Sequence, residues 1–194
     1  KLLINYRLLK RRYMSTLDQQ TKSRIDQWLS AEYDAETVAQ VKQLVDNNEE
    51  TELLDSFYKE LEFGTGGLRG IMGVGSNRIN KYTLGKATQG LANYLKKQFP
   101  DQQIKVAVSY DSRNNSQTLG HLVADVFSAN DIHVFLFEQL RPTPMLSFAV
   151  RHFNCQSGVM LTASHNPKEY NGYKAYWNDG GQLVAPHDEN VITE

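Results

Sequence analysis

The beginning of the chain has the apolar spacing of short amphipathic helices. Between Leu17 and Glu60, apolar residues recur every three or four positions in three groups, which polar stretches at residues 30–34 and 46–51 separate. The groups are Ile25, Trp28 and Leu29; Val38, Val41, Leu44 and Val45; and Leu53, Leu54, Phe57, Tyr58 and Leu61. The pattern predicts three short helices packed on the main body. Amphipathic stripes usually face a core, so a stabilising extension is favoured over a regulatory or partner-binding arm.

Farther along the chain, strand patterns alternate with helix patterns. Runs rich in β-branched residues predict three strands, at residues 104–110, 132–137 and 157–161. Helical spacing predicts three helices, at residues 80–99, from about 116 to 127, and at 143–151. Asn115 or Ser116 is expected to cap the second helix, and Thr143 and Pro144 suit the N-cap and first position of the third. This β-α-β-α-β order predicts a mainly parallel sheet covered by helices.

The end of the chain has the signal of a hairpin. Strand patterns at Tyr173–Trp177 and Gln182–Ala185 flank the turn sequence Asn178-Asp179-Gly180-Gly181, and another helix is expected from about Pro186. Together the elements predict an α/β fold. It consists of a three-layer α/β/α domain with a mainly parallel mixed sheet over residues 62–194, preceded by a short helical extension over residues 1–61.

Composition limits the functions that this chain can have. Its 194 residues are 40% hydrophobic and 22% charged, as in a soluble globular domain with an added segment. The net charge of −1 gives no reason to expect binding to nucleic acid or to a membrane, and no apolar run reaches the length of a membrane span. A single cysteine, Cys155, excludes a disulfide framework and suits a reducing compartment. We therefore expect a cytoplasmic protein with this thiol buried.

Candidate chemistry begins where the third predicted strand ends. Residues 159–161 are followed by Thr162-Ala163-Ser164-His165-Asn166-Pro167, which predicts a turn at the carboxyl end of the strand. Ligands of open α/β sheets bind at that end, so Ser164 is a candidate nucleophile. The alternative is a plain turn, because Ser, His and Asn are ordinary turn residues. Side chains of sequence neighbours often point apart, which makes His165 a poor candidate for the base that activates Ser164.

A second candidate segment is rich in glycine. Phe63-Gly64-Thr65-Gly66-Gly67-Leu68-Arg69-Gly70 contains four glycines, which allow close backbone approach to an anion, and Arg69 offers a fork for phosphate. The Gly-Lys-Ser/Thr ending of a P-loop is missing, and Arg69 stands where a dinucleotide fingerprint has its third glycine. From the residues alone, a plain loop and a phosphate cradle are equally good interpretations.

Asp111 and Arg113 follow the strand predicted at residues 104–110. They are therefore expected at the same edge of the sheet as Ser164, where they could hold the site in shape. An aspartate in this position is also an ordinary turn and cap residue, and that structural interpretation is favoured.

Two strings together resemble a known family. Thr162-Ala163-Ser164-His165-Asn166-Pro167, followed by Asn171-Gly172-Tyr173-Lys174, resembles the phosphoserine loop of the α-D-phosphohexomutase superfamily, the phosphoglucomutases and phosphomannomutases. The glycine-rich string resembles the first active-site segment of the same enzymes, and the likeness covers about residues 62–194. It implies that Ser164 carries a phosphate bridged by Mg²⁺ and that Arg69 lies near it.

The resemblance also implies roles for further residues. Lys174 is a candidate general acid/base, for which it would need a lowered pKa, and its alternative is a solvated charge on a strand. His165 is expected to orient or neutralise the phosphoryl group. Thr65, Arg69, Asn166 and Lys174 are expected to contact the substrate or its phosphate.

The reaction implied is the interconversion of hexose 1-phosphate and hexose 6-phosphate. The phosphoserine gives its phosphate to the hexose phosphate, the hexose 1,6-bisphosphate turns around, and the serine takes back the other phosphate. The family's Asp-x-Asp-x-Asp-Arg metal loop and its later domains are not in this sequence. We therefore expect the first domain of a larger enzyme, which needs the missing domains as partners and is inactive by itself.

Two other functions are kept as alternatives. A phosphate-binding or interaction module could retain the loop without catalysis. A serine hydrolase is weaker, because the Gly-x-Ser-x-Gly elbow is missing. The sequence does not distinguish glucose, mannose and pentose phosphates.

Overall fold

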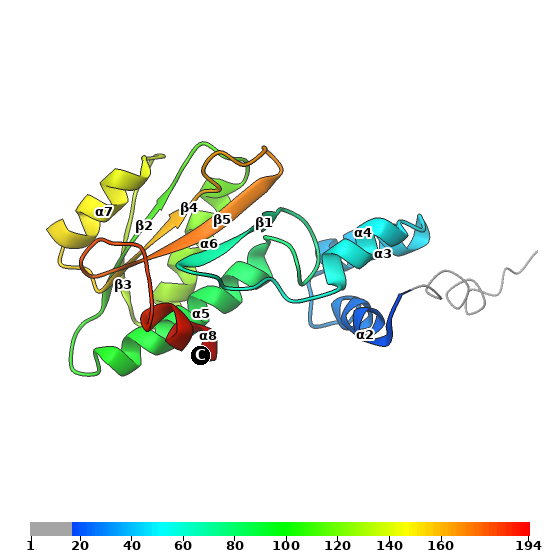
Figure 1. Ribbon diagram of the computed structural model, residues 1–194, viewed down its shortest axis with the longest axis horizontal. Helices are drawn as coiled ribbons and strands as arrows, with labels where there is room; N and C mark the ends of the chain where they lie inside the picture. Colours follow the sequence, from blue (N-terminus) through cyan, green and yellow to red (C-terminus); the bar gives the residue numbers. More distant parts are fainter. Residues whose placement is uncertain (1–16) are drawn as a thin grey trace, which may run out of the picture. The chain divides into compact units, whose positions relative to one another are not determined.

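The computed structural model describes residues 17–194, which form two compact units (Figure 1). One unit comprises residues 17–61 and 73–78, and the other comprises residues 62–72 and 79–194. Residues 1–16, the start of the predicted extension, lie outside the described residues.

The first unit contains the three helices that the apolar spacing predicts: α2 (Gln19–Trp28), α3 (Ala35–Asp46) and α4 (Glu50–Phe57). Aspartates begin two of them, because Asp18 Oδ1 accepts from Thr21 N at 2.8 Å and Asp34 Oδ1 accepts from Thr37 N at 3.2 Å. The helices bury Ile25, Val41 and Phe57 completely, and the ring of Trp28 meets the ring of Phe57 edge to face at 5.7 Å. The apolar residues of the helices therefore form the centre of this unit, while their packing on the main body and their stabilising role stay predictions.

The second unit is built on a five-stranded sheet with the order β1-β5-β4-β2-β3 (Figure 1). The strands are β1 (Gly67–Ile71), β2 (Lys105–Tyr110), β3 (His133–Leu136), β4 (Ser157–Leu161) and β5 (Tyr170–Trp177). Strand β2 pairs in parallel with β3 and β4, whereas β5 pairs antiparallel with β4 and with β1. Only β5 therefore runs against the other strands, which confirms the predicted mainly parallel mixed sheet.

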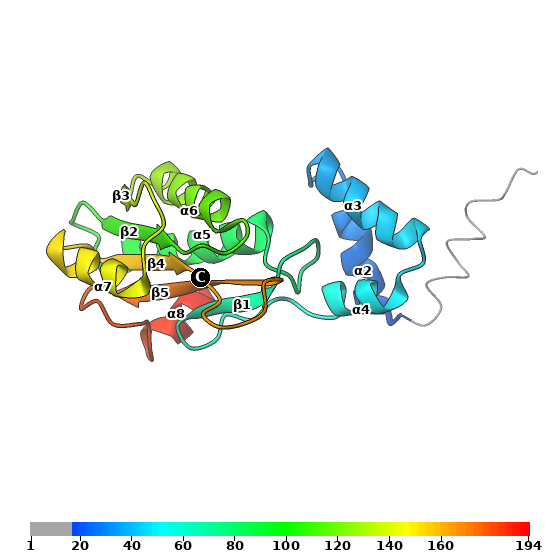
Figure 2. The same ribbon diagram turned by 90° about the horizontal axis from the view of Figure 1, so that it is seen from above.

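Helices cover both faces of this sheet (Figure 2). They are α5 (Lys81–Gln98), α6 (Ser116–Ala129), α7 (Thr143–His152) and α8 (His187–Thr193). Ala107 of β2 belongs to the core cluster under α7, whereas Tyr110 of the same strand lies against Gly120 of α6. Side chains of a strand alternate between faces, so α6 and α7 lie on opposite faces. This arrangement confirms the three-layer α/β/α fold.

The structure corrects several predicted boundaries. The segment Gly67–Ile71, predicted as part of a loop, forms strand β1, and β5 begins at Tyr170 rather than at Tyr173. Gly67 permits this pairing because a side chain there would start 1.8 Å from the carbonyl oxygen of Tyr173. The predicted return strand at residues 182–185 is reduced to an isolated bridge between Gln182 and Tyr176.

Two helix starts also differ in detail from the prediction. Helix α7 has Pro142 as its N-cap, one residue before the predicted Thr143. Helix α6 follows Asn115 as predicted, but Asn115 has a left-handed backbone with φ of 60° and makes no capping hydrogen bond with its side chain. The turn before α6 is stabilised instead by the Ser116 hydroxyl, which donates to Asp111 Oδ1 at 3.1 Å.

Candidate functional site

Ser164 lies in the loop that leaves the carboxyl end of β4. The strand ends at Leu161, Thr162 and Ala163 are buried, and Ser164 and His165 are exposed. Ser164 has φ of 56°, in the left-handed region that residues other than glycine rarely adopt. The hydroxyl group therefore emerges from the sheet at an abrupt change of backbone direction.

Asp111 and Thr162 hold the backbone where the loop begins. Thr162 Oγ1 donates to Asp111 Oδ2 at 2.5 Å and accepts from the backbone N–H of Ser164 at 3.0 Å. Asp111 Oδ1 accepts from the backbone N–H of Arg113 at 3.1 Å and from the Ser116 hydroxyl. One carboxylate thus joins the ends of β2 and β4 to the start of α6.

Arg113 binds the same loop through its carbonyl groups. Its Nη2 donates to the carbonyl oxygens of Ser164 and Asn166, both at 2.7 Å. Its Nη1 donates to those of Pro167 at 2.9 Å and Tyr170 at 3.0 Å. The favoured interpretation of Asp111 and Arg113 as ordinary turn residues was therefore too narrow. Asp111 does stabilise its own turn, but both side chains also hold the Ser164 loop.

The strand pairing places Arg69 and Lys174 on the same face of the sheet. Arg69 of β1 lies opposite Gly172 of β5, and the N–H of Thr162 donates to the carbonyl of Gly172 from the other side at 3.0 Å. Lys174 is two residues farther along β5, opposite Gly67. Residues two apart in a strand share a face, so the exposed Arg69 and the half-buried Lys174 are diagonal neighbours. The three strands that carry Arg69, Lys174 and the Ser164 loop lie side by side.

The remaining predicted site residues have different surroundings. His165 Nδ1 lies 3.3 Å from Ser164 Oγ, at the long end of hydrogen-bond distances. Asn166 is half-buried, and its Oδ1 is buried without a hydrogen-bond partner. Thr65 is exposed in the turn that two backbone hydrogen bonds between Gly64 and Gly67 close, at 2.8 and 3.1 Å. The structure brings His165 and Asn166 to the Ser164 loop, while Thr65 lies on the turn before β1.

A magnesium ion would need ligands that residues 17–194 do not provide. No three His, Cys, Asp or Glu side chains in this part of the chain lie together in an arrangement that could hold a metal. The carboxylate of Asp111, which supports the start of the loop, has both oxygens occupied by hydrogen bonds from Thr162, Ser116 and the Arg113 backbone. The described residues therefore do not form a complete magnesium site.

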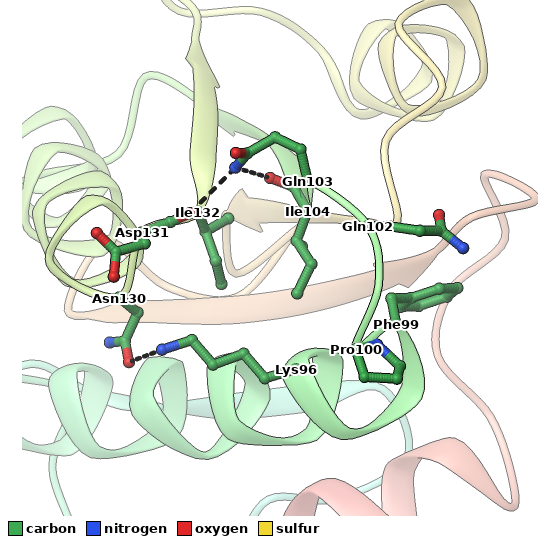
Figure 3. Close-up of a pocket in the computed structure, with 9 residues that line it drawn as sticks. All are labelled: Lys96, Phe99, Pro100, Gln102, Gln103, Ile104, Asn130, Asp131 and Ile132. Atoms are coloured by element: carbon green, nitrogen blue, oxygen red, sulfur yellow. Dashed lines mark hydrogen bonds between the residues drawn. The ribbon is translucent and has the colours of Figure 1, made fainter.

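Other features of the described chain lie away from this loop. A cavity of about 180 Å³ is found where the strands β2 and β3 begin, at the edge of the sheet opposite to Ser164 (Figure 3). Two of its polar side chains form hydrogen bonds across the lining, Lys96 Nζ to Asn130 Oδ1 at 3.1 Å and Gln103 Nε2 to the Asp131 carbonyl at 3.1 Å. Among the helices of residues 17–194, none combines the length and apolar character required to span a membrane.

Arg113 is the residue whose contribution the sequence understated. An arginine two positions after a strand-end aspartate is the signal that was available. That signal could not show which groups the guanidinium would meet, because the carbonyls that it binds lie 51 to 57 positions later in the chain.

The fold and the loop define an α/β/α domain with an exposed serine at the carboxyl edge of its sheet. Residues 60–194 match the family model described as phosphoglucomutase/phosphomannomutase, alpha/beta/alpha domain I. The chain belongs to this family.

Curated relatives support the same assignment. Phosphopentomutase of Homo sapiens is 41% identical over 182 residues, covering 90% of this chain and 29% of that protein. Glucose 1,6-bisphosphate synthase of Mus musculus is 41% identical over 196 residues, covering 97% and 31%. Phosphoglucomutase of Staphylococcus epidermidis is 42% identical over 153 residues, covering 79% and 28%. The chain thus spans about three tenths of the length of these relatives.

Solved structures share the fold. The exocytosis-sensitive phosphoprotein pp63/parafusin of Paramecium, a phosphoglucomutase, matches with a TM-score of 0.58 and 27% identity over 70% of this chain and 25% of that chain. A protein of Thermus thermophilus matches with a TM-score of 0.64 and 29% identity over 70% of this chain and 30% of that chain.

Proposed function

We propose that this chain is the phosphoserine-bearing part of a sugar-phosphate mutase. Ser164 is the phosphate carrier, and the substrate is a hexose phosphate or, as the name of the human relative suggests, a pentose phosphate. The observation that carries the proposal is that the Ser164 hydroxyl is exposed while the backbone of Ser164 is held. Its N–H donates to Thr162, and its C=O accepts from Arg113. The cytoplasmic location stays a prediction.

The proposed reaction consists of two phosphoryl transfers. In the first, the bond between phosphorus and Ser164 Oγ breaks while a bond forms to a hydroxyl of the sugar phosphate, giving a sugar bisphosphate. In the second, Ser164 Oγ takes the other phosphoryl group, so that the enzyme is restored and the phosphate has changed position. Transfers of this kind depend mainly on positioning and on neutralising negative charge.

The cations near the loop have separate proposed tasks. Arg69, exposed on β1, is suited to bind phosphate oxygens as a planar fork. Lys174 is the proposed general acid/base, which takes the proton of the attacking sugar hydroxyl and later returns one. His165 is proposed to orient the phosphoryl group, and Thr65 and Asn166 to contact the substrate or its phosphate. Mg²⁺, which would neutralise phosphate charge, requires ligands from outside residues 17–194.

Intact-mass measurement on the full-length polypeptide tests the proposal. We expect the purified protein, after incubation with a sugar bisphosphate, to gain one phosphoryl group that Ser164→Ala removes and Ser112→Ala leaves in place. Ser112 is a matched control because it is also an exposed loop serine. A full-length protein that never becomes phosphorylated at Ser164 would instead support the non-catalytic binding module.

A second candidate reaction is the synthesis of glucose 1,6-bisphosphate. It is favoured by the mouse relative of that name, which aligns with 97% of this chain, compared with 90% for the human phosphopentomutase. Product analysis separates the two: a mutase equilibrates the two monophosphates, whereas a synthase accumulates the bisphosphate. The 194-residue chain alone is expected to do neither at an appreciable rate.

A further inference from the structure

We infer that Arg113 is a positioning residue for phosphoryl transfer: it holds the Ser164 loop in the conformation that presents the hydroxyl. This inference rests on the proposed function for its catalytic consequence, but not for its structural content. It assigns a task to a residue that itself does not contact the reacting atoms.

The guanidinium group directs its terminal donors entirely to one loop. Arginine has four N–H bonds on Nη1 and Nη2. Each nitrogen donates to two carbonyl oxygens, so four carbonyls of residues 164–170 converge on a single side chain. A lysine ammonium has three donors and no planar fork, so it cannot reproduce this arrangement. Because these donors already have partners, Arg113 is not available to bind a phosphate in this conformation.

The backbone of Ser164 needs such support. A serine with φ of 56° occupies a sparsely populated region, which persists only when surrounding contacts impose it. Here the N–H of Ser164 is held by Thr162 Oγ1 at 3.0 Å, and its carbonyl is held by Arg113 Nη2 at 2.7 Å. Both backbone polar groups of Ser164 are therefore fixed, while its side-chain hydroxyl remains exposed.

The Arg113 side chain also forms an ion pair with Asp111. Its Nε lies 3.8 Å from Asp111 Oδ2, which is an ion-pair distance without a hydrogen bond, and the Arg113 side chain is only 12% exposed. Asp111 also accepts the Thr162 hydroxyl that binds the Ser164 N–H. Asp111 thus supports the loop through Thr162 and the N–H of Ser164, and Arg113 supports the same loop through four of its carbonyl groups.

Removing the guanidinium is expected to affect the rate more than substrate binding. The freed loop would spend less time with the hydroxyl in its reactive place, and a displacement of about 1 Å can cost up to about 100-fold in rate. Arg69 and Lys174 would remain on their strands to bind phosphate. We therefore expect kcat to fall about 10- to 100-fold while KM stays within about twofold.

The test compares three variants of the full-length polypeptide, Arg113→Met, Arg113→Lys and Arg151→Met. The third is the control, because Arg151 is an exposed arginine on α7. Steady-state kinetics give kcat and KM, and hydrogen exchange reports on the peptide that covers residues 162–171. We expect faster exchange in this peptide alone and a lower kcat for Arg113→Met. Arg113→Lys should be intermediate, and Arg151→Met should match the wild type. If Arg113→Met fails to fold, the comparison of Arg113→Lys with Arg151→Met decides.

Unchanged exchange of the loop peptide, or an unchanged kcat in an active enzyme, would overturn the inference. Failure of the proposed function is seen separately, as a wild-type protein that neither turns over sugar phosphates nor becomes phosphorylated at Ser164. In that case the exchange measurement still decides whether Arg113 holds the loop.

Discussion

At position 164 the side chain is exposed while the backbone is held on both sides. The sequence was sufficient to predict the turn, because an apolar strand ends and small and polar residues follow it. It did not predict the left-handed conformation of Ser164, since the group that binds its carbonyl lies 51 positions earlier in the chain. A residue type can thus indicate a site, whereas the conformation that makes it usable depends on distant partners.

Cys155 supplies a prediction at the same scale. Burial raises the pKa of its thiol from 9.0 to about 11, and the residue is 2% exposed. At pH 8 the thiolate is then roughly 100-fold rarer than in an exposed cysteine. We expect iodoacetamide to label the folded chain at least about tenfold more slowly than the urea-unfolded chain, as followed by mass spectrometry. Equal rates would contradict this burial.

The same thiol links stability to alkaline pH. Its pKa is higher in the folded chain than in the unfolded chain, so its contribution to stability is present below about pH 9 and is lost as the pH approaches about 11. The free energy of unfolding should fall across this interval, and less steeply in Cys155→Ala.

Among the elements, β1 departs most from the sequence prediction. Four glycines in eight residues indicate a loop by local preference, and strands normally avoid glycine. In the structure the segment forms an edge strand, because the carbonyl of Tyr173 approaches Gly67 more closely than any side chain would allow. Strands β2 and β4, in contrast, were predicted almost to the residue, at 104–110 and 157–161, from their strand-like residue pattern.

Two glycine substitutions test this account of β1. Gly67→Ala would place a side chain 1.8 Å from the Tyr173 carbonyl oxygen at φ of 148°, so we expect the free energy of unfolding to fall by at least about 2 kcal/mol. Gly85 lies in α5, and a Cβ atom added there would meet no other atom within 4 Å. Gly85→Ala should therefore raise the free energy of unfolding by about 0.5–1 kcal/mol. Urea unfolding followed by circular dichroism measures both. A tolerated Gly67→Ala would show that β1 does not need this close approach.

On the scale of the whole molecule, the two compact units do not follow a single boundary in the sequence. Residues 73–78 lie between β1 and α5 in the chain, but they belong to the unit of α2, α3 and α4. Within that unit, Arg78 is 2% exposed and its Nη2 contacts Glu52 at 2.8 Å and Asp55 at 2.7 Å. The apolar pattern could not predict this association, because polar contacts make it: the ion pairs of Arg78 and hydrogen bonds such as that from the Asn77 N–H to the Ser56 carbonyl at 2.9 Å.

A single substitution tests the contact between residues 73–78 and the helices of the same unit. Arg78→Met removes the donors to Glu52, Asp55 and the Asp55 carbonyl, which we expect to cost about 1–3 kcal/mol because the carboxylates are partly solvated. Lys42→Met, an exposed cation on α3, is the matched control and should change stability by less than about 0.5 kcal/mol.

The positions of the two tryptophans allow the stability of the helical unit to be measured separately. Trp28 lies in the helical unit and Trp177 in the sheet unit. In a Trp177→Phe background, urea unfolding followed by fluorescence therefore reports on the helical unit. A transition for Arg78→Met that coincides with that of Lys42→Met would mean that Arg78 does not stabilise the unit.

The sequence by itself determined the layered α/β/α fold, the helices before it and the place of Ser164 at the end of a strand. These features follow from hydrophobic periodicity and from the preferences of turn residues, and both depend only on residues close together in the sequence. Only the tertiary structure decided that the glycine-rich segment is a strand, that residues 73–78 join the helices, and that Asp111 and Arg113 hold the serine loop. The physical reason is that pairing, burial of charge and hydrogen bonding join residues that are far apart in the chain, and no local pattern specifies which partners will meet.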